Sequence, residues 1–130
     1  MQMKHLLATV TLCLAAGSLP AHAAYSGNYE RCLEAAQGIS AKEVVCVTSE
    51  SVYQDAMLNH YYNKLSKGLT PEQAKLLKDA QRAWIIYRDA SLPFADSLGG
   101  ANAINSTRTL MEMTKDRAEE LEQMCKDYLK

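Results

Sequence analysis

The feature that most constrains this chain is a helical repeat of apolar residues that recurs in three long segments. We expect helices from Ser40 to about Lys67, from Thr70 to about Leu92, and from about Ala103 to the C-terminus. Each segment places apolar side chains every three or four positions, as a helix with one buried face does. The predicted buried faces are Val47, Met57, Leu58, Tyr61 and Leu65 in the first segment; Leu76, Ala80, Ala83, Trp84 and Tyr87 in the second; and Thr107, Met111, Thr114, Ala118, Leu121, Cys125 and Tyr128 in the third.

Local signals set the ends of these helices. Ser40 and Glu43 have the spacing of a capping box, and Thr70 and Gln73 repeat it with Pro71 at the first helical position. These pairs satisfy backbone amides that the first turn of a helix leaves without partners. We therefore expect the first two long helices to begin at defined residues.

Other signals mark a short helix and the turns. The short helix is predicted from about Ser26 to Gln37 and ends at Gly38. Pro93 ends the long helix that begins at Thr70, and Gly99-Gly100 makes a turn. Strand signals are almost absent. The predicted fold class is all-α: an antiparallel bundle of three long helices, with the short N-terminal helix folded against the first of them.

The first 23 residues are typical of a signal peptide. Lys4 precedes an apolar run, Leu6 to Leu19, which is too short to span a bilayer, and Ala21-His22-Ala23 is a small-x-small cleavage pattern. Lipid attachment at Cys13 is the minor alternative, because a small residue does not precede it. We expect a single mature domain, residues 24–130, without a membrane span and located in the periplasm or outside the cell.

Charge and composition narrow the function. Removing Lys4 leaves 13 of the 14 basic residues against 15 acidic ones, a net charge of −2 with no nucleic-acid footprint. His60 is the one histidine after residue 23, so the usual zinc ligand sets cannot be assembled, and we expect neither metal nor cofactor. A compact bundle also leaves little room for the two acids of a glycosidase across a sugar cleft, so an enzyme is the weaker hypothesis.

Three cysteines remain after residue 23, and export favours disulfides. Cys32 and Cys46 flank the Gly38 turn, whereas Cys125 lies near the far end of the last helix, roughly 30 Å from Cys46 at 1.5 Å rise per residue. We predict a Cys32–Cys46 disulfide that ties the short helix to its neighbour. Cys125 is interpreted as a buried free thiol.

The stretch Ala80 to Ala90, AQRAWIIYRDA, gathers two arginines, an aspartate and the only tryptophan of the chain. We interpret Trp84 as core and expect Arg88 to reach an acid of the preceding helix, Asp55 or Glu50, which would fix helix register. This structural interpretation is favoured over a recognition site. It also covers Asp55 with Asn59, and Asp116 with Arg117.

These residues carry a resemblance to a known family. Four stretches carry it, in this order: Tyr29 with Cys32; Cys46 followed by Glu50, Asp55, Asn59 and Tyr62; AQRAWIIYRDA; and Thr114 to Leu121 in the pattern T-x-x-R-A-x-E-L. In these stretches the chain is similar to the LprI-like small secreted bacterial proteins. The positions of this chain that form the structural motif are Glu50, Asp55, Asn59, Gln81, Arg82, Trp84, Tyr87, Arg88, Asp89 and Arg117. The resemblance implies a cysteine-tied helical domain. Ser91-Leu92-Pro93 stands where the family often has a further cysteine, so we expect no second disulfide.

The function that the resemblance implies is inhibition of lysozyme or another muramidase by a protein that binds it without catalysis. The predicted loop from Ser91 to Ser106 is the candidate partner-binding segment, with Ser91, Asp96 and Asn102 as its candidate contact residues, because a protruding loop can enter an enzyme cleft. Two alternatives remain: an immunity or envelope-stress protein with another protein partner, and a small wall hydrolase.

Overall fold

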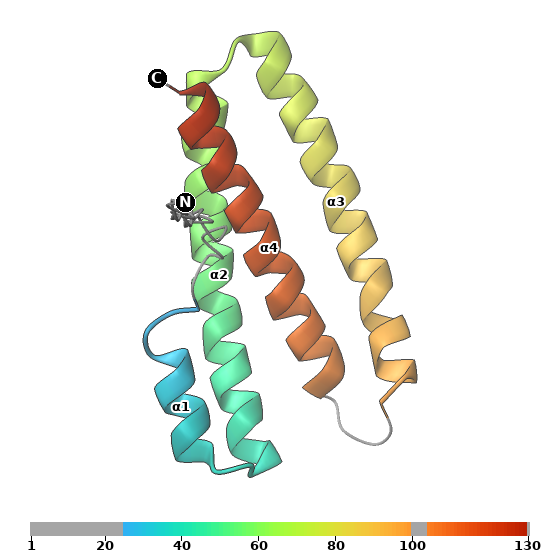
Figure 1. Cartoon of the computed structure of the whole chain (residues 1–130). Coiled ribbons are helices and arrows are strands. Elements are labelled where there is room, and N and C mark those ends of the chain that lie inside the picture. Colours follow the sequence, from blue (N-terminus) through green and yellow to red (C-terminus); the bar gives the residue numbers. More distant parts are fainter. Residues whose placement is uncertain (1–24, 100–103, 130) are drawn as a thin grey trace, which may run out of the picture.

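The computed structural model describes residues 25–99 and 104–129, and these residues form four helices and no strand. They are α1 (Tyr29–Ala36), α2 (Ser40–Gly68), α3 (Pro71–Ser97) and α4 (Ile104–Tyr128). Figure 1 shows α2, α4 and α3 side by side as long rods, with α4 between the other two and α1 against the lower half of α2. The all-α prediction of three long helices and a short one is confirmed.

The predicted starts of the long helices are partly right. At α3, Thr70 Oγ1 accepts from the Gln73 amide at 3.3 Å and Gln73 Oε1 accepts from the Thr70 amide at 3.0 Å, with Pro71 as the first residue. At α2 the predicted capping box does not form, because Ser40 is already helical. The carbonyl of Ile39 accepts the amides of Lys42 and Glu43 instead.

The end of α3 differs from the prediction. Pro93 lies inside the helix, which continues to Ser97, about one turn beyond the expected stop at Leu92. A proline removes one helical hydrogen bond, and this position is solvent-exposed, where water can bind the free carbonyl. The prolonged helix shortens the connection to α4.

The disulfide joins α1 to α2, as predicted. The Cα atoms of Cys32 and Cys46 lie 5.6 Å apart, and the chain reverses between them through Gln37 (φ 52°) and Gly38 (φ 76°), both left-handed. A cross-link that closes about 15 residues stabilises by roughly 3 kcal/mol in the chain-entropy model. This contribution matters to α1, because an eight-residue helix is too short to be stable alone.

A buried polar cluster, which the sequence analysis did not predict, fastens the segment before α1. The carboxylate of Glu50, almost fully buried on α2, accepts hydrogen bonds from the amide and hydroxyl of Ser26 and from Gln54 Nε2. The hydroxyl of Tyr25 donates to the carboxylate of Glu112 on α4, at 2.8 Å to Oε1. Burial, together with this hydrogen bond to a carboxylate, raises the pKa of Tyr25 well above its usual range. Ser26 therefore serves this cluster, and α1 begins three residues later than predicted.

Two apolar clusters form the core, mostly between α2 and α4. The first contains Tyr29, Ala36, Cys46, Val47 and Met111, and the second contains Leu58, Leu65, Ala118, Leu121 and Cys125. The predicted buried faces of α2 and α4 are therefore right in their central residues, whereas Tyr128 is exposed. Cys125 is a buried free thiol, as predicted, and donates to the carbonyl of Tyr61 at 3.6 Å.

The predicted buried face of α3 is wrong. Leu76 and Tyr87 are exposed, as are Ala80 and Ala83, and Trp84 alone of the five is half-buried. The face that packs on α4 is rotated from the prediction and contains Ala74, Leu77, Gln81, Trp84, Arg88, Ser91 and Ala95. These residues alternate steps of three and four, but three of them (Gln81, Arg88 and Ser91) are polar, so hydropathy alone favoured the other face.

Candidate functional site

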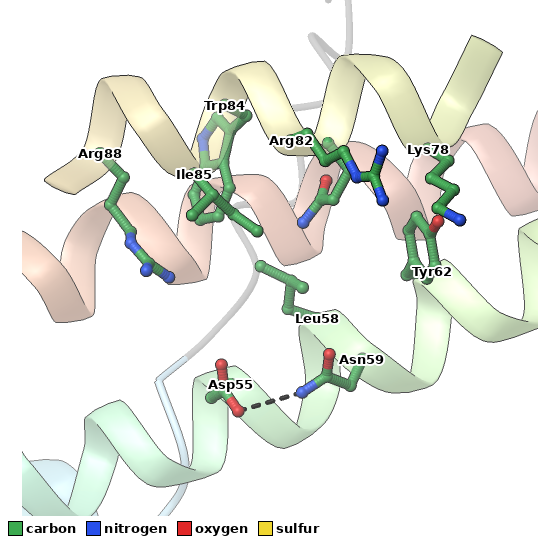
Figure 2. Close-up of a pocket in the computed structure, with 10 residues that line it drawn as sticks. Asp55, Leu58, Asn59, Tyr62, Lys78, Arg82, Trp84, Ile85 and Arg88 are labelled. Carbon is green, nitrogen blue, oxygen red and sulfur yellow. Dashed lines mark hydrogen bonds between the residues drawn. The ribbon is translucent and has the colours of Figure 1, made fainter. Parts of the chain in front are cut away.

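A groove lies between α2 and α3. Both helices pack along α4, and they contact each other directly over little of their length (Figure 1). The groove has a volume of about 310 Å³. Figure 2 shows its two walls, with Asp55, Leu58, Asn59 and Tyr62 on α2 facing Lys78, Arg82, Trp84, Ile85 and Arg88 on α3.

The groove continues toward α4. A second hollow of about 280 Å³ shares Asp55 and Arg88 with the first and adds Val52 from α2 and Leu110 and Thr114 from α4. Six of the ten structural-motif residues therefore line one concave surface, together with Tyr62: Asp55, Asn59, Gln81, Arg82, Trp84 and Arg88. We therefore take this surface as the candidate site.

The α3 wall is basic. Lys78 and Arg82 are both exposed, and neither forms an ion pair with any residue that the structure describes. Their positive charges also act on Asp79. The pKa of Asp79 is lowered, mainly by the hydrogen bond from Lys75, with smaller contributions from Arg82 and Lys78. Two cations on one wall can bind a carboxylate-bearing partner.

The α2 wall carries one acidic group, Asp55, beside polar and apolar side chains. Asp55 accepts a hydrogen bond from Asn59 Nδ2 at 3.0 Å, as the sequence analysis predicted for this pair. Leu58 is buried at the base of the groove, and Tyr62 is half-buried beside it. The groove thus combines apolar floor, aromatic rings and hydrogen-bonding groups, which is the composition of a binding site.

Arg88 does not form the predicted bridge. Its Nη2 lies 2.7 Å from Asp89 Oδ1, and its guanidinium lies 5.3 Å from the centre of the Trp84 ring. Glu50, one of the two expected partners, is occupied by Ser26 and Gln54, and Asp55 lines the groove opposite Arg88 without an ion pair. The prediction was wrong because α2 and α3 diverge, which leaves a neighbour on the same helix nearer than any acid of α2.

Arg117 and Gln81 hold α3 to α4. Arg117 Nε donates to Gln81 Oε1 at 3.0 Å, and its Nη1 lies 2.7 Å from Glu120 Oε2. Gln81 is the one buried residue of α3. The expected pair of Asp116 with Arg117 does not form, and the carboxylate of Asp116 lies 3.5 Å from Lys115 Nζ. This hydrogen bond joins two motif residues across the contact between α3 and α4.

The predicted partner-binding loop is largely helix. Ser91 and Asp96 lie in α3, where the Ser91 hydroxyl donates to the carbonyl of Tyr87. Asp96 Oδ1 accepts the backbone amide of Ser106 at 3.0 Å and so caps the first turn of α4. Asn102 lies outside the described residues. Neither Ser91 nor Asp96 belongs to a protruding loop, and Asp96 has a structural partner.

The site offers no metal centre. Within residues 25–99 and 104–129, no group of three or more His, Cys, Asp or Glu side chains is placed to hold a metal ion. Among the same helices, none is both long and apolar enough to cross a bilayer. The groove itself offers charged, hydrogen-bonding and apolar side chains.

The fold and the groove define the class: a small all-α protein with one disulfide among the described residues and a groove between two of its helices. Residues 32–121 match the family model described as lysozyme inhibitor LprI, so the chain belongs to that family. Comparisons with curated proteins and with solved structures gave no match. The resemblance carried by AQRAWIIYRDA is thus confirmed, and the family is one of inhibitors rather than enzymes.

Proposed function

We propose that this protein is exported and inhibits a lysozyme-type muramidase by stoichiometric binding, with the α2–α3 groove as the binding surface. Membership of the inhibitor family supports the activity, and the apolar run before Ala21-His22-Ala23 supports export. The observation that carries the choice of surface is the pair Lys78 and Arg82, which face the groove without an acidic partner among the described residues.

Charge makes the groove suitable for this partner. Muramidases hydrolyse the bacterial cell wall with a pair of carboxyl groups in a cleft. The cationic side chains of the α3 wall would be attracted to those carboxyl groups at the rim of the cleft. The mature chain has a net charge of −2 and thus also attracts the basic surface of many lysozymes. The overall negative charge would speed the encounter of the inhibitor with the enzyme, and the basic α3 wall would set the orientation in which the two proteins bind.

Shape indicates how inhibition works. A groove receives a convex edge, so we propose that the rim of the enzyme cleft enters between α2 and α3. The helix α3 would then lie across the cleft, with Lys78 and Arg82 near the catalytic carboxylates and Trp84 and Ile85 against the rim. The polysaccharide is excluded because the helix occupies its path.

A turbidity assay tests the proposal. The purified mature protein is added to a suspension of bacterial walls with a muramidase, and the expected result is slower lysis. Arg82→Glu should abolish the effect, because it reverses the charge at the groove. Arg31→Glu is the matched control, since Arg31 is exposed on α1 away from the groove and should leave inhibition intact.

The other outcomes separate the alternatives. An absence of inhibition with the folded wild-type protein would favour an immunity or envelope-stress protein with a different partner. Lysis without added enzyme would identify a wall hydrolase. Equal inhibition by wild type and Arg82→Glu would leave the activity in place but refute the groove as its surface.

A further inference from the structure

A second surface of α3, on the side away from the groove, is apolar and exposed. It consists of Leu76, Ala80, Ala83, Tyr87, Ala90 and Phe94, which we call the outer stripe. The exposed fractions of Leu76, Tyr87 and Phe94 are 63, 65 and 66%. Six residues at alternating steps of four and three lie along one face of a helix, as in the seam of a coiled coil. The outer stripe therefore has the pattern of a helix that packs on a partner.

The helix that carries the outer stripe is the least supported of the long helices. Gln81 is the single buried residue among the 27 of α3, whereas α2 and α4 bury six each. Figure 1 shows α3 at one edge of the structure, with α4 on one side only. Because most helical stability comes from packing an apolar face, a long edge helix with its apolar face in water gains most from a partner.

The spacing of the outer stripe fits a second copy of this chain. Its positions are symmetric about residue 85, so two antiparallel copies of α3 place Leu76 opposite Phe94 and Ala80 opposite Ala90 of the other copy. Ala83 then lies opposite Tyr87, a small residue facing a large one. The alanines allow close approach of the two backbones, and the aromatic rings fill the space beside them.

Charge and area agree with this pairing. Glu72 and Asp79 flank one side of the stripe, and the antiparallel arrangement sets them opposite the C-terminal half, where Ile86 and Pro93 flank the same side. No like charges meet there.

The stripe offers on the order of 500 Å² of apolar surface per copy, judged from the size of its aromatic and aliphatic side chains. A standard interface buries roughly 800 Å² per partner, so the stripe supplies its apolar centre and the flanks its rim.

We propose that the mature protein is a homodimer, joined by antiparallel packing of the α3 outer stripes about a two-fold axis near residue 85. Lys78, Arg82 and Ile85 lie on the opposite side of α3, in the groove, so both grooves stay open in the dimer. The dimer is therefore independent of the inhibitor proposal and would present two identical binding sites.

The test begins with the mass in solution. Sedimentation equilibrium of the mature protein should give a monomer–dimer equilibrium. Tyr87→Lys should raise its dissociation constant at least tenfold, because it puts a charge at the centre of the apolar contact. Tyr128→Lys is the matched control, since Tyr128 is 74% exposed on α4 and its replacement should leave the dissociation constant unchanged. Circular dichroism establishes that each variant is folded.

Cysteine cross-linking tests the orientation. Ala80→Cys mixed with Ala90→Cys should oxidise to a mixed disulfide dimer, because the two positions face each other. Each variant alone should cross-link poorly, since its own copies lie roughly 15 Å apart along the helix axis. Cross-linking of Ala80→Cys with itself, equal to that of the mixture, would refute the antiparallel register.

Other results overturn the proposal outright. A monomer at every concentration refutes it, as does a dimer that Tyr87→Lys leaves intact. Binding of the monomer to anionic lipid vesicles, lost in Tyr87→Lys, would assign the outer stripe to a membrane surface instead.

Discussion

Removal of the Gln81–Arg117 link should destabilise the fold more than any other single polar contact of α3. Gln81 is 8% exposed and the Arg117 side chain 11%, and the 3.0 Å hydrogen bond between them joins α3 to α4. Hydrogen bonds to charged groups contribute about 1.5–3 kcal/mol, and a buried polar group left without its partner costs about 1–3 kcal/mol. We expect Arg117→Ala and Gln81→Ala each to lower the free energy of unfolding by about 2 kcal/mol.

A double-mutant cycle separates this link from general packing. The double variant should lose about 1–2 kcal/mol less than the sum of the two single losses, because the second change removes a partner that is already missing. Urea unfolding followed by circular dichroism measures all four proteins. Lys75→Ala is the control on α3, since its ion pair with Asp79 is exposed and such pairs contribute about 0–1 kcal/mol. Single losses below about 0.5 kcal/mol, or strictly additive losses, would show that α3 is held by other contacts.

Three further results are expected. Cys125 should react with iodoacetamide only after unfolding, because it is buried and burial raises the pKa of its thiol, and rapid labelling of the native protein would contradict this. Glu50→Ala should lower the free energy of unfolding by about 2–4 kcal/mol in urea, since it leaves the Ser26 and Gln54 donors without an acceptor. The raised pKa of Tyr25 means that the unfolded chain loses this proton first, so the free energy of unfolding should fall as pH rises above about 10. Tyr25→Phe should reduce that pH dependence, part of which remains because burial also raises the pKa values of Tyr29 and Tyr61, and an unchanged slope between about pH 9 and 11 would refute the assignment.

The sequence predicted features whose causes are local. The start of α3 follows from Thr70, Pro71 and Gln73, which act within one turn, and the Cys32–Cys46 disulfide follows from a reversal that Gly38 permits. The buried faces of α2 and α4 were also predictable, because these helices pack mainly on each other and their apolar stripes face one partner.

The orientation of α3 was not predictable from periodicity. This helix has two regularly spaced faces, one apolar and the other interrupted by Gln81 and Arg88, and the less apolar face packs on α4. Gln81 can be buried there because its acceptor is satisfied by Arg117, which is 36 residues away in the sequence. A contact over such a distance leaves no periodic signal in a single sequence, so neither the true buried face nor the groove beside it was visible.

The residues of the motif AQRAWIIYRDA have several different surroundings, because a helix at the edge of a bundle packs on one face only and leaves its other faces exposed. Gln81 and Trp84 turn inward, where they contact α4 and the core and form the inner side of the groove, Arg82 and Arg88 continue its wall, and Ala83 and Tyr87 belong to the outer stripe. Since the three faces contact different surroundings, substitutions on them should change different properties: unfolding free energy, partner binding and self-association. A motif that looks like a single site in the sequence is thus divided by helical geometry into a face toward α4, a groove wall and an exposed apolar stripe.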